Sequence, residues 1–505
     1  MNRVNTCILR NAQAAPLSAM PLLSGDDFHT LVAGGTREGR RLISLFGCPL
    51  TGGGVRLVAV VAGTGESQVA VAATRVERAY PALTLECPQA HWFEREMAEQ
   101  WGVEPVGHPW LKPIRFHPTY RTDGKGDRRD PPPQPGVTDF FRVEGEEVHE
   151  VAVGPVHAGI IEPGHFRFQC HGEEVLNLEI SLGYQHRGIE RAMVGGPSGR
   201  SLHLMETLAG DTTIGHATAY CQAVEALAGV RVPARAQAIR AIALELERLA
   251  NHTGDLGAMA GDVGYLPAMS YCGRIRGDFL NLTALLCGNR FGRNLVCPGG
   301  VAFDLEKERL AQLESRLEQA LRDTTNAVNL LWETSSVRAR FENTGTVSKE
   351  TCLDLGLVGP VARACGVERD VRREFPFGLF RFFQIPVSTF HHGNVFGRAY
   401  VRWLEIQRSV DFIQEQLKSL PGGGTRASMK PLPPNQFCLS MVEGWRGEIC
   451  HVGLTGNNGR WMLYKVSDPS LHNWMGLAIA LRGQQISDFP LCNKSFNLSY
   501  CGHDL

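Results

Sequence analysis

Three long stretches of this chain carry apolar residues at the spacing of an amphipathic helix, and they limit the folds open to it. The first covers residues 233–252 and begins with Pro233, a residue well suited to a helix start. Similar stripes run through 310–331 and 403–420, and the last is followed at once by Pro421 and three glycines. Helices of this length must bury their apolar faces against one another, so the pattern predicts a helix bundle.

The segment before residue 119 has a different pattern. Residues 55–61 (VRLVAVV) and 68–73 (QVAVAA) are rich in β-branched residues and predict strands, and residues 90–101 predict a helix. Residues 119–139 are charged and then proline-rich, which is typical of a linker, stiff at its three consecutive prolines. We therefore expect three parts: a small domain over 1–118, a linker over 119–139 and a large domain over 140–505.

Residues 448–466 (EICHVGLTGNNGRWMLYKV) predict a β-hairpin whose turn lies within residues 456–459. The expected fold class is multidomain α+β. A small N-terminal α/β domain would precede a mainly α-helical bundle domain with small β elements.

Composition and hydropathy give no support for several functional classes. Of 505 residues, 43% are hydrophobic, as in ordinary folded proteins, and the net charge is −1. A near-neutral chain gives no support for nucleic acid as a partner. No apolar run reaches the roughly 18 residues of a membrane span, and the first twenty residues lack the apolar core of a secretion signal. We expect a cytoplasmic protein whose membrane link comes through partner subunits.

The chain has 14 cysteines, and no two are spaced as a CxxC pair. Zinc ribbons and iron–sulfur sites use such closely spaced thiolates, so the cysteines predict buried, reduced side chains and not a metal site. The chain also lacks a strand-borne GxGxxG, so any NADH chemistry would belong to another subunit.

Residues 154–190 read GPVHAGIIEPGHFRFQCHGEEVLNLEISLGYQHRGIE. This stretch resembles the large catalytic subunit of membrane-bound [NiFe] hydrogenases of the formate-hydrogenlyase type. It is also similar to the quinone-site (49-kDa-type) subunit of respiratory complex I. Further blocks follow in the order of that family, at residues 217–258, 355–372, 393–417 and 447–466. Because the blocks cover nearly the whole chain, the resemblance implies the hydrogenase large-subunit scaffold for residues 140–505.

Residues 91–118 (HWFEREMAEQWGVEPVGHPWLKPIRFHP) resemble the 30-kDa-type subunit of complex I, which docks beside the quinone-site subunit and carries no cofactor. The resemblance implies a fusion of the two modules. Within this stretch, Glu94, Arg95 and Glu96 predict a solvated or ion-paired helix face.

In the hydrogenases that this chain resembles, two CxxC pairs hold the nickel–iron centre through soft thiolates. Matching the chain to that pattern without gaps places Ala209 and Thr212 at the first pair, and Ser499 and Gly502 at the second. None of the four is a cysteine, so we expect no hydrogenase activity and no bound metal. Cys501 and His503 are close in sequence, but two ligands do not make a metal site.

The complex I resemblance fails at a different point. Its quinone-site histidine and tyrosine match Ile161 and Gly210 here, so the usual proton donors to a quinone headgroup are missing. A quinone bound in an apolar slot, with its headgroup held by other donors, stays an alternative.

Three residues are our candidates for proton relay. Glu162 matches the hydrogenase glutamate implicated in proton movement, and burial beside apolar neighbours would raise its pKa. Asp211 and His216 lie in LAGDTTIGH, which replaces the cysteine loop. The structural alternatives are an ion pair of Glu162 with Arg167 or another arginine, a helix cap for Asp211 and a core role for His216. If the scaffold is kept, further polar groups would face the same space: Thr212, Ser499, Tyr500, Cys501 and His503.

Four other residues lie in stretches shared by both families: His157, His186, Arg187 and Glu190. We expect them to stabilise the scaffold or its contact with an iron–sulfur partner.

The first hypothesis is a subunit of a membrane-associated, complex I-like and hydrogenase-related oxidoreductase complex. It would lack the nickel–iron ligands and couple electron transfer or conformational change to proton or ion translocation. The expected partners are a small iron–sulfur subunit, which carries the cluster, and antiporter-like membrane subunits, with no cofactor in this chain. Two alternatives stay open: an NADH–quinone oxidoreductase-type subunit with a remodelled quinone site, and a non-catalytic scaffold.

Overall fold

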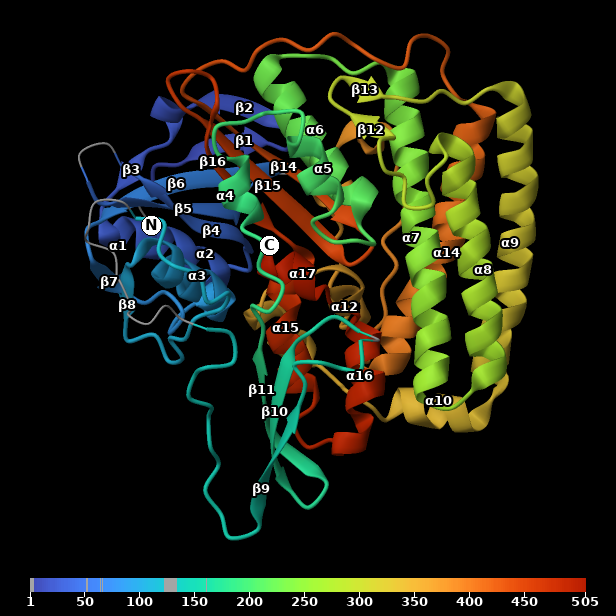
Figure 1. Ribbon diagram of the computed structural model, residues 1–505, viewed down its shortest axis with the longest axis horizontal. Helices are drawn as coiled ribbons and strands as arrows, with labels where there is room; N and C mark the ends of the chain where they lie inside the picture. The colour runs from blue at the N-terminus through green and yellow to red at the C-terminus, as the bar shows by residue number, and fades with distance from the viewer. Residues whose placement is uncertain (1–3, 51–52, 64, 66, 122–133, 160) are drawn as a thin grey trace.

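The computed structural model describes residues 4–50, 53–63, 65, 67–121, 134–159 and 161–505. The segment before residue 119 is built on a five-stranded sheet with the order β1-β6-β5-β4, in which the short β3 pairs with β6 (Figure 1). The strands and helices of this part are β1 (Cys7–Arg10), β3 (Leu22–Leu23), α1 (Gly25–His29), α2 (Gly35–Arg37), β4 (Leu42–Pro49), β5 (Val55–Ala62), β6 (Gln68–Val76), β7 (Ala79–Pro81), α3 (His91–Trp101) and β8 (Glu104–Val106).

Both strands and the helix predicted here are confirmed, as β5, β6 and α3. The continuous apolar run of β5 is explained by burial on both faces, since successive strand side chains point to opposite sides. Leu57 and Val61 pack into the core shared with α3, whereas Val58 and Val60 pack into the core shared with the rest of the chain. The sheet is therefore an inner layer of the molecule.

Four long helices form the predicted bundle, seen as near-parallel ribbons at the right of Figure 1. Two match the expected stripes closely, α7 (Ala234–Asp262) and α9 (Lys307–Glu333), and α14 (Val395–Lys418) contains most of the third. The fourth, α8 (Leu266–Cys287), was not predicted. The shorter helices between residues 189 and 374 are α4 (Ile189–Met193), α5 (Ser201–Glu206), α6 (Thr213–Ala228), α10 (Ser335–Glu342), α11 (Lys349–Asp354), α12 (Gly359–Ala364) and α13 (Val371–Glu374).

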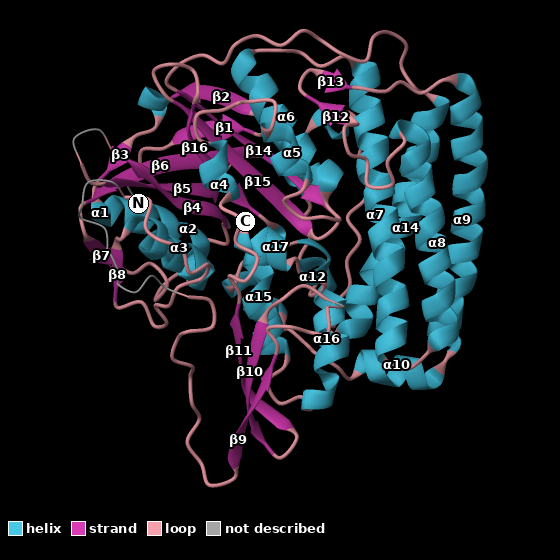
Figure 2. Cartoon of the chain, in the orientation of Figure 1, coloured by secondary structure: helices cyan, strands magenta, loops and turns pink. Residues whose placement is uncertain are grey.

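The hairpin expected at 448–466 is present as β15 (Gly447–Thr455) and β16 (Trp461–Ser467). It belongs to a larger sheet of order β16-β15-β14-β2, which adds β14 (Gln436–Gly444) and β2 (Gln13–Pro16). Every residue of β15 is buried, and α6 packs on this sheet, so the sheet is a core layer between the first sheet and the bundle (Figure 2).

A separate three-stranded sheet, β9 (Val148–Val153), β10 (His165–His171) and β11 (Glu174–Ser181), extends away from the body. The last helices are α15 (Pro469–Ala480), α16 (Phe489–Phe496) and α17 (Tyr500–Asp504). A two-stranded sheet of β12 (Val296–Cys297) and β13 (Gly300–Val301) lies near one end of the bundle. None of the helices that the structure describes has the length and apolar character needed to cross a bilayer.

The division of the chain at 119–139 stays a prediction, and most of the linker, including its three prolines, lies outside the described residues. Contacts between the parts before and after it are extensive. β2 pairs with β14, and buried Glu96 of α3 accepts hydrogen bonds from Arg115 and from Lys465 of β16. The first hundred residues therefore pack tightly against the C-terminal part.

The prediction of a solvated face on α3 is wrong. Glu94, Arg95 and Glu96 are all buried. Glu94 accepts hydrogen bonds from the backbone of Leu83 and Thr84, and Arg95 donates to two backbone carbonyls. The ion-paired alternative holds for Glu96 alone. Buried polar side chains are stabilised by hydrogen-bond partners of this kind.

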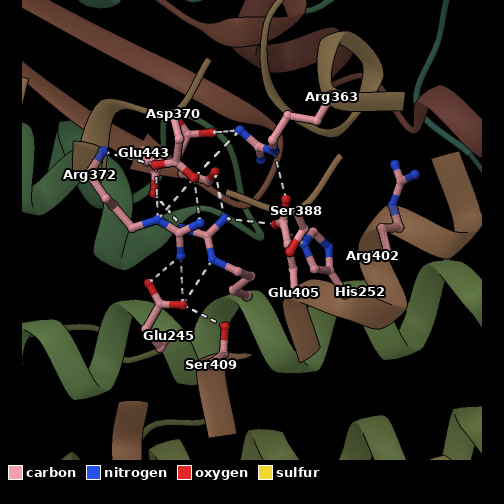
Figure 3. Close-up of polar contacts among 12 residues, drawn as sticks. Glu245, His252, Arg363, Asp370, Arg372, Ser388, Arg402, Glu405, Ser409 and Glu443 are labelled. Carbon is pink, nitrogen blue, oxygen red and sulfur yellow. Dashed lines mark hydrogen bonds and ion pairs between the residues drawn. The ribbon is translucent and has the colours of Figure 1, made fainter. Parts of the chain in front are cut away.

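A buried ionic cluster ties α7 and α14 to α12, α13 and β14 (Figure 3). Its centre is Arg363, whose Nε donates to Glu405 at 2.7 Å and whose Nη1 donates to Glu443 at 2.8 Å. Arg372 bonds both Asp370 and Glu245, at 2.6 and 3.1 Å. The cluster therefore links the helix bundle to β14 of the central sheet.

Candidate functional site

The loop at residues 208–212, which the hydrogenase resemblance matches to a cysteine pair, leads into the start of α6, and a carboxylate from α7 holds that start. Glu247 accepts hydrogen bonds from the backbone N–H of Ile214 at 2.7 Å and of Gly215 at 3.2 Å. Burial raises the pKa of Glu247 to about 8, although the two N–H donors act in the opposite direction. The start of α6 is therefore held by a carboxyl group whose pKa burial raises to about 8.

Asp211 does not cap α6, so the alternative prediction that it is a helix cap is wrong. Its carboxylate forms a two-point ion pair with Arg446, with N–O distances of 2.6 and 2.8 Å. Burial would raise the pKa of Asp211, but Arg446 more than offsets it and holds the pKa below its usual range. The Arg446 guanidinium lies 3.9 Å from the ring centre of Trp445. Asp211 is thus a fixed anion, with 33% of its side chain exposed at the rim of the site.

His216 is fully buried and forms hydrogen bonds through both ring nitrogens. Nε2 lies 3.1 Å from a carboxylate oxygen of Asp468, and Nδ1 lies 3.0 Å from Nε2 of His451. Burial acts to raise the pKa of Asp468, but the hydrogen bond and charge of His216, with Arg446, keep it below its usual value. His216 therefore belongs to a polar path through the core.

The C-terminal helix brings a second group of candidates to the same place. Glu162 accepts hydrogen bonds from the backbone N–H of Tyr500 and Cys501, both at 3.3 Å. Burial raises the pKa of the Cys501 thiol to about 12, with Glu162 as the next cause, and the thiol also bonds the backbone of Gly210. Glu162, Cys501 and the loop before Asp211 are thus neighbours.

Ser499 and Thr212 also lie at this site. The Ser499 hydroxyl accepts the N–H of Gly502 at 2.9 Å and lies 3.4 Å from the sulfur of Cys501. The Thr212 hydroxyl accepts the indole N–H of Trp445 at 3.1 Å. Both hydroxyls are already engaged with protein groups.

Two of the expected residues point elsewhere. The His503 ring bonds Asp504 at 3.0 Å and packs edge-on against Trp92 of α3, away from Asp211. The Tyr500 ring packs against Trp474, with 5.0 Å between ring centres. Backbone geometry of the short α17 turns these two side chains into the core. The predicted alternative of an ion pair between Glu162 and Arg167 is wrong, because Arg167 pairs with Glu150 at 2.8 Å.

The residues of the shared stretches have structural contacts, as expected. His157 and His186 bond the backbone carbonyls of Gly164 and Asp504, at 2.9 and 2.7 Å. Arg187 donates to the carbonyls of Thr207 and Leu208, and Glu190 accepts from Lys465 at 2.9 Å. Their expected contact with an iron–sulfur partner stays a prediction.

The residues present do not fit a nickel–iron centre. Ala209 has no donor atom, the Thr212 and Ser499 hydroxyls are engaged, and a side chain at Gly502 would meet the Asp468 carboxyl at 2.7 Å. Among the described parts of the chain, no three His, Cys, Asp or Glu side chains are grouped so as to hold a metal ion. All 14 cysteines are free thiols, and 11 of them are buried.

Three residues of the site were not among the sequence candidates: Glu247, Arg446 and Asp468. Glu247 was detectable in principle, since a glutamate next to Leu246 stands at the edge of an apolar stripe. Arg446 and Asp468 were not, because they meet Asp211 and His216 only through contacts 235 and 252 residues apart in sequence.

Comparisons with known proteins agree with this scaffold. The family model of the respiratory-chain NADH dehydrogenase 49 Kd subunit matches residues 262–437, and that of the 30 Kd subunit matches residues 49–134. Formate hydrogenlyase subunit 5 of Escherichia coli is 32% identical over 83% of this chain and 76% of its own length. The carbon monoxide-induced hydrogenase of Rhodospirillum rubrum is 32% identical over 69% of this chain and 97% of its own.

An NADH-quinone oxidoreductase subunit of Clostridium beijerinckii is 30% identical over 66% of this chain and 91% of its own length. A solved structure of the membrane-bound sulfane sulfur reductase, an archaeal respiratory membrane complex, superposes with a TM-score of 0.67 and 23% identity. That match covers 72% of this chain and all of that one, and supports the fold. The chain therefore belongs to the hydrogenase-related family of complex I 49-kDa-type subunits, with a 30-kDa-type segment fused ahead of it.

Proposed function

We propose that this chain is the large subunit of a membrane-associated, complex I-like oxidoreductase complex whose site handles protons without a nickel–iron centre. The proposal is supported by an ordered polar set beside the four positions that the hydrogenase resemblance matches to the metal-binding cysteines, none of which is a cysteine here. Asp211 with Arg446, and Asp468 with His216, occupy the place that the hydrogenase resemblance gives to the metal. Fixed charges beside groups able to exchange protons suit coupling of a redox or conformational event to ion translocation.

Glu162, Asp211 and His216 have different roles in this proposal. Glu162 lies at the N-terminal turn of α17, beside the Cys501 thiol, and exchanges protons with the site. Asp211 holds Arg446 and does not itself titrate near neutral pH, because the ion pair favours its charged form. His216 exchanges protons with Asp468.

The relatives support the proposed assembly. Formate hydrogenlyase and NADH-quinone oxidoreductase are multisubunit systems by name, and the structural neighbour is a respiratory membrane complex. The proposed partners are a small iron–sulfur subunit and antiporter-like membrane subunits. The chain would lie peripherally at the membrane and carry no cofactor of its own.

In the alternative function, a quinone binds at the same site. Ile161, beside Glu162, is 38% exposed and the Asp211 side chain is 33% exposed, so one apolar and one polar side chain are accessible to a ligand. A quinone headgroup here would take its hydrogen bonds from donors other than the histidine and tyrosine of complex I, for example the Cys501 thiol.

The test is redox turnover of the purified native complex, with Glu162→Gln as the variant. We expect turnover to fall by roughly 100-fold, since a proton-exchanging carboxyl contributes at least that factor. Glu147→Gln, a glutamate 80% exposed in a surface loop, is the matched control and should leave turnover unchanged. Turnover within twofold of the wild type in Glu162→Gln contradicts the role of Glu162. Inhibition by quinone-site inhibitors would favour the quinone alternative, and no turnover in the wild type would favour the scaffold.

A further inference from the structure

Four buried groups form a single hydrogen-bonded file from the site into the core. Asp468 lies 3.1 Å from Nε2 of His216, and Nδ1 of His216 lies 3.0 Å from Nε2 of His451. Nδ1 of His451 lies 3.0 Å from the hydroxyl of Tyr464. None of the four residues is more than 2% exposed. The file joins the start of α15, α6, β15 and β16.

The hydrogen positions follow from the ends of the file. An ionised Asp468 can only accept, so Nε2 of His216 carries hydrogen. If Nδ1 of His216 is bare, it accepts from Nε2 of His451, and Nδ1 of His451 then accepts the Tyr464 hydroxyl. If His216 gains a proton at Nδ1, His451 must carry its hydrogen on Nδ1 and donate to the Tyr464 oxygen. Both arrangements keep all three hydrogen bonds, which is the property that a proton relay needs.

The inner end of the file lies at the site. A side chain on Gly502 would come within 2.7 Å of the Asp468 carboxyl, and Arg446, which pairs with Asp211, also acts on the Asp468 charge. A proton that reaches Asp468 is therefore beside Gly502, one of the positions that the hydrogenase resemblance matches to a metal ligand.

The outer end lies beside a cavity of 540 Å³ between β16, β4 and α3. Tyr464 contributes to its wall together with charged Lys465 and Glu190, and the wall is otherwise largely apolar, including Phe46 and Trp101. A space of this size with polar groups in its wall can hold water. The cavity therefore adjoins residue Tyr464, whose hydroxyl is turned to His451.

Few charged groups act on the four residues of the file. Burial holds the pKa of His451 well below its usual value, with the charge of His216 as the second cause, and burial raises that of Tyr464 well above its own. The titratable and charged groups that act on the file from the packed elements are Tyr220 and Cys221 of α6, Cys438 of β14, Cys450 of β15, and Arg446 in the turn between β14 and β15. The thiols and Tyr220 are kept protonated by burial, so Arg446 is the only fixed charge among them.

We propose that Tyr464, His451 and His216 form a proton-supply path that delivers protons to Asp468 at the site. One proton enters at the Tyr464 oxygen from water as the Tyr464 hydroxyl hydrogen passes to Nδ1 of His451. The Nε2 hydrogen of His451 passes to Nδ1 of His216, and the Nε2 hydrogen of His216 passes to Asp468. One proton is taken up and one is delivered, with no change in oxidation state. The proposal rests on the proton-handling function above and adds His451 and Tyr464 as positioning residues that act through His216.

The first test is an NMR titration of the full chain labelled with ¹⁵N-histidine. We expect His216 to gain a proton at Nδ1 in the same step in which His451 moves its hydrogen from Nε2 to Nδ1. Tyr464→Phe removes the acceptor for that hydrogen, so the coupled step should move to lower pH or disappear. Tyr220→Phe is the matched control, because it removes another phenol, 2% exposed and 6.0 Å from the Tyr464 ring, that is not part of the file. Independent titration of the two histidines, or an unchanged step in Tyr464→Phe, overturns the proposal.

The second test is redox turnover of the native complex carrying the same two variants. Tyr464→Phe should lower turnover by roughly 100-fold, the effect of losing a proton-transfer group, and Tyr220→Phe should not. A coupled histidine step with normal turnover in Tyr464→Phe would overturn the supply role. A wild-type complex without turnover would contradict the proposed function and the supply role together, and the histidine titration would then decide whether the hydrogen-bonded file itself exists.

Discussion

Replacing Arg363 with methionine is expected to lower the free energy of unfolding by about 4 kcal/mol, the typical cost of removing one partner from a buried ion pair. Arg363 is fully buried and bonds both Glu405 and Glu443 (Figure 3). Without it, Glu405 keeps His252 at 2.8 Å, but the Glu443 carboxylate keeps a single hydrogen bond within the described parts of the chain, from the backbone N–H of Val371. Burial and the charge of Asp370 already raise the pKa of Glu443 to about 7, so this carboxyl would then be held in its protonated form.

The measurement is urea unfolding followed by circular dichroism, with Arg373→Met as the matched control. Arg373 is 62% exposed and pairs with Glu368, which is 68% exposed, an interaction worth no more than about 1 kcal/mol. Equal midpoints for the two variants would show that the cluster contributes nothing specific to the bundle.

Glu247→Gln is expected to change how stability depends on pH. The pKa of Glu247 is about 8 in the folded protein and 4.5 without the fold, so folding binds a proton between these values. The contribution of Glu247 to the free energy of unfolding is fully present below pH 4.5 and is lost as the pH rises toward 8. The loss reaches about 5 kcal/mol, at 1.36 kcal/mol per pKa unit. The glutamine variant does not ionise, so its stability relative to the wild type should rise across this window.

The measurement is the unfolding midpoint of both proteins at several pH values from 4.5 to 8.5. Glu318→Gln controls for the loss of one charge, because its carboxylate is half exposed on α9. Parallel pH profiles for wild type and Glu247→Gln would mean that Glu247 is ionised throughout the window and that its carboxylate caps α6 as a fixed anion.

Much of the fold could be predicted from sequence because its signals are local. The apolar stripes of α7 and α9 and the strands around the 456–459 turn follow from periodicity and turn residues alone. α8 was missed because Gly273 and Gly277 interrupt its pattern. The pairing of β2 with β14 joins residues more than 400 positions apart, and no local pattern encodes such a contact.

The site shows the same limit. The residue types in the loop before α6 and in the C-terminal tail indicated a polar site, and Glu162, Cys501 and Asp211 do gather there. Their roles depend on partners that sequence could not supply, since Arg446 fixes the charge of Asp211 from a β-turn far along the chain. Side-chain direction was a further limit, because α17 turns His503 toward Trp92.

The most direct test of the account is metal and quinone analysis of the purified native complex, performed on one sample. We expect iron from the iron–sulfur partner and no stoichiometric nickel, because Ala209, Thr212, Ser499 and Gly502 provide no thiolate. Quinone without nickel would support the remodelled quinone site. One nickel atom per chain would contradict the central claim, since it would require a set of ligands that this site does not contain.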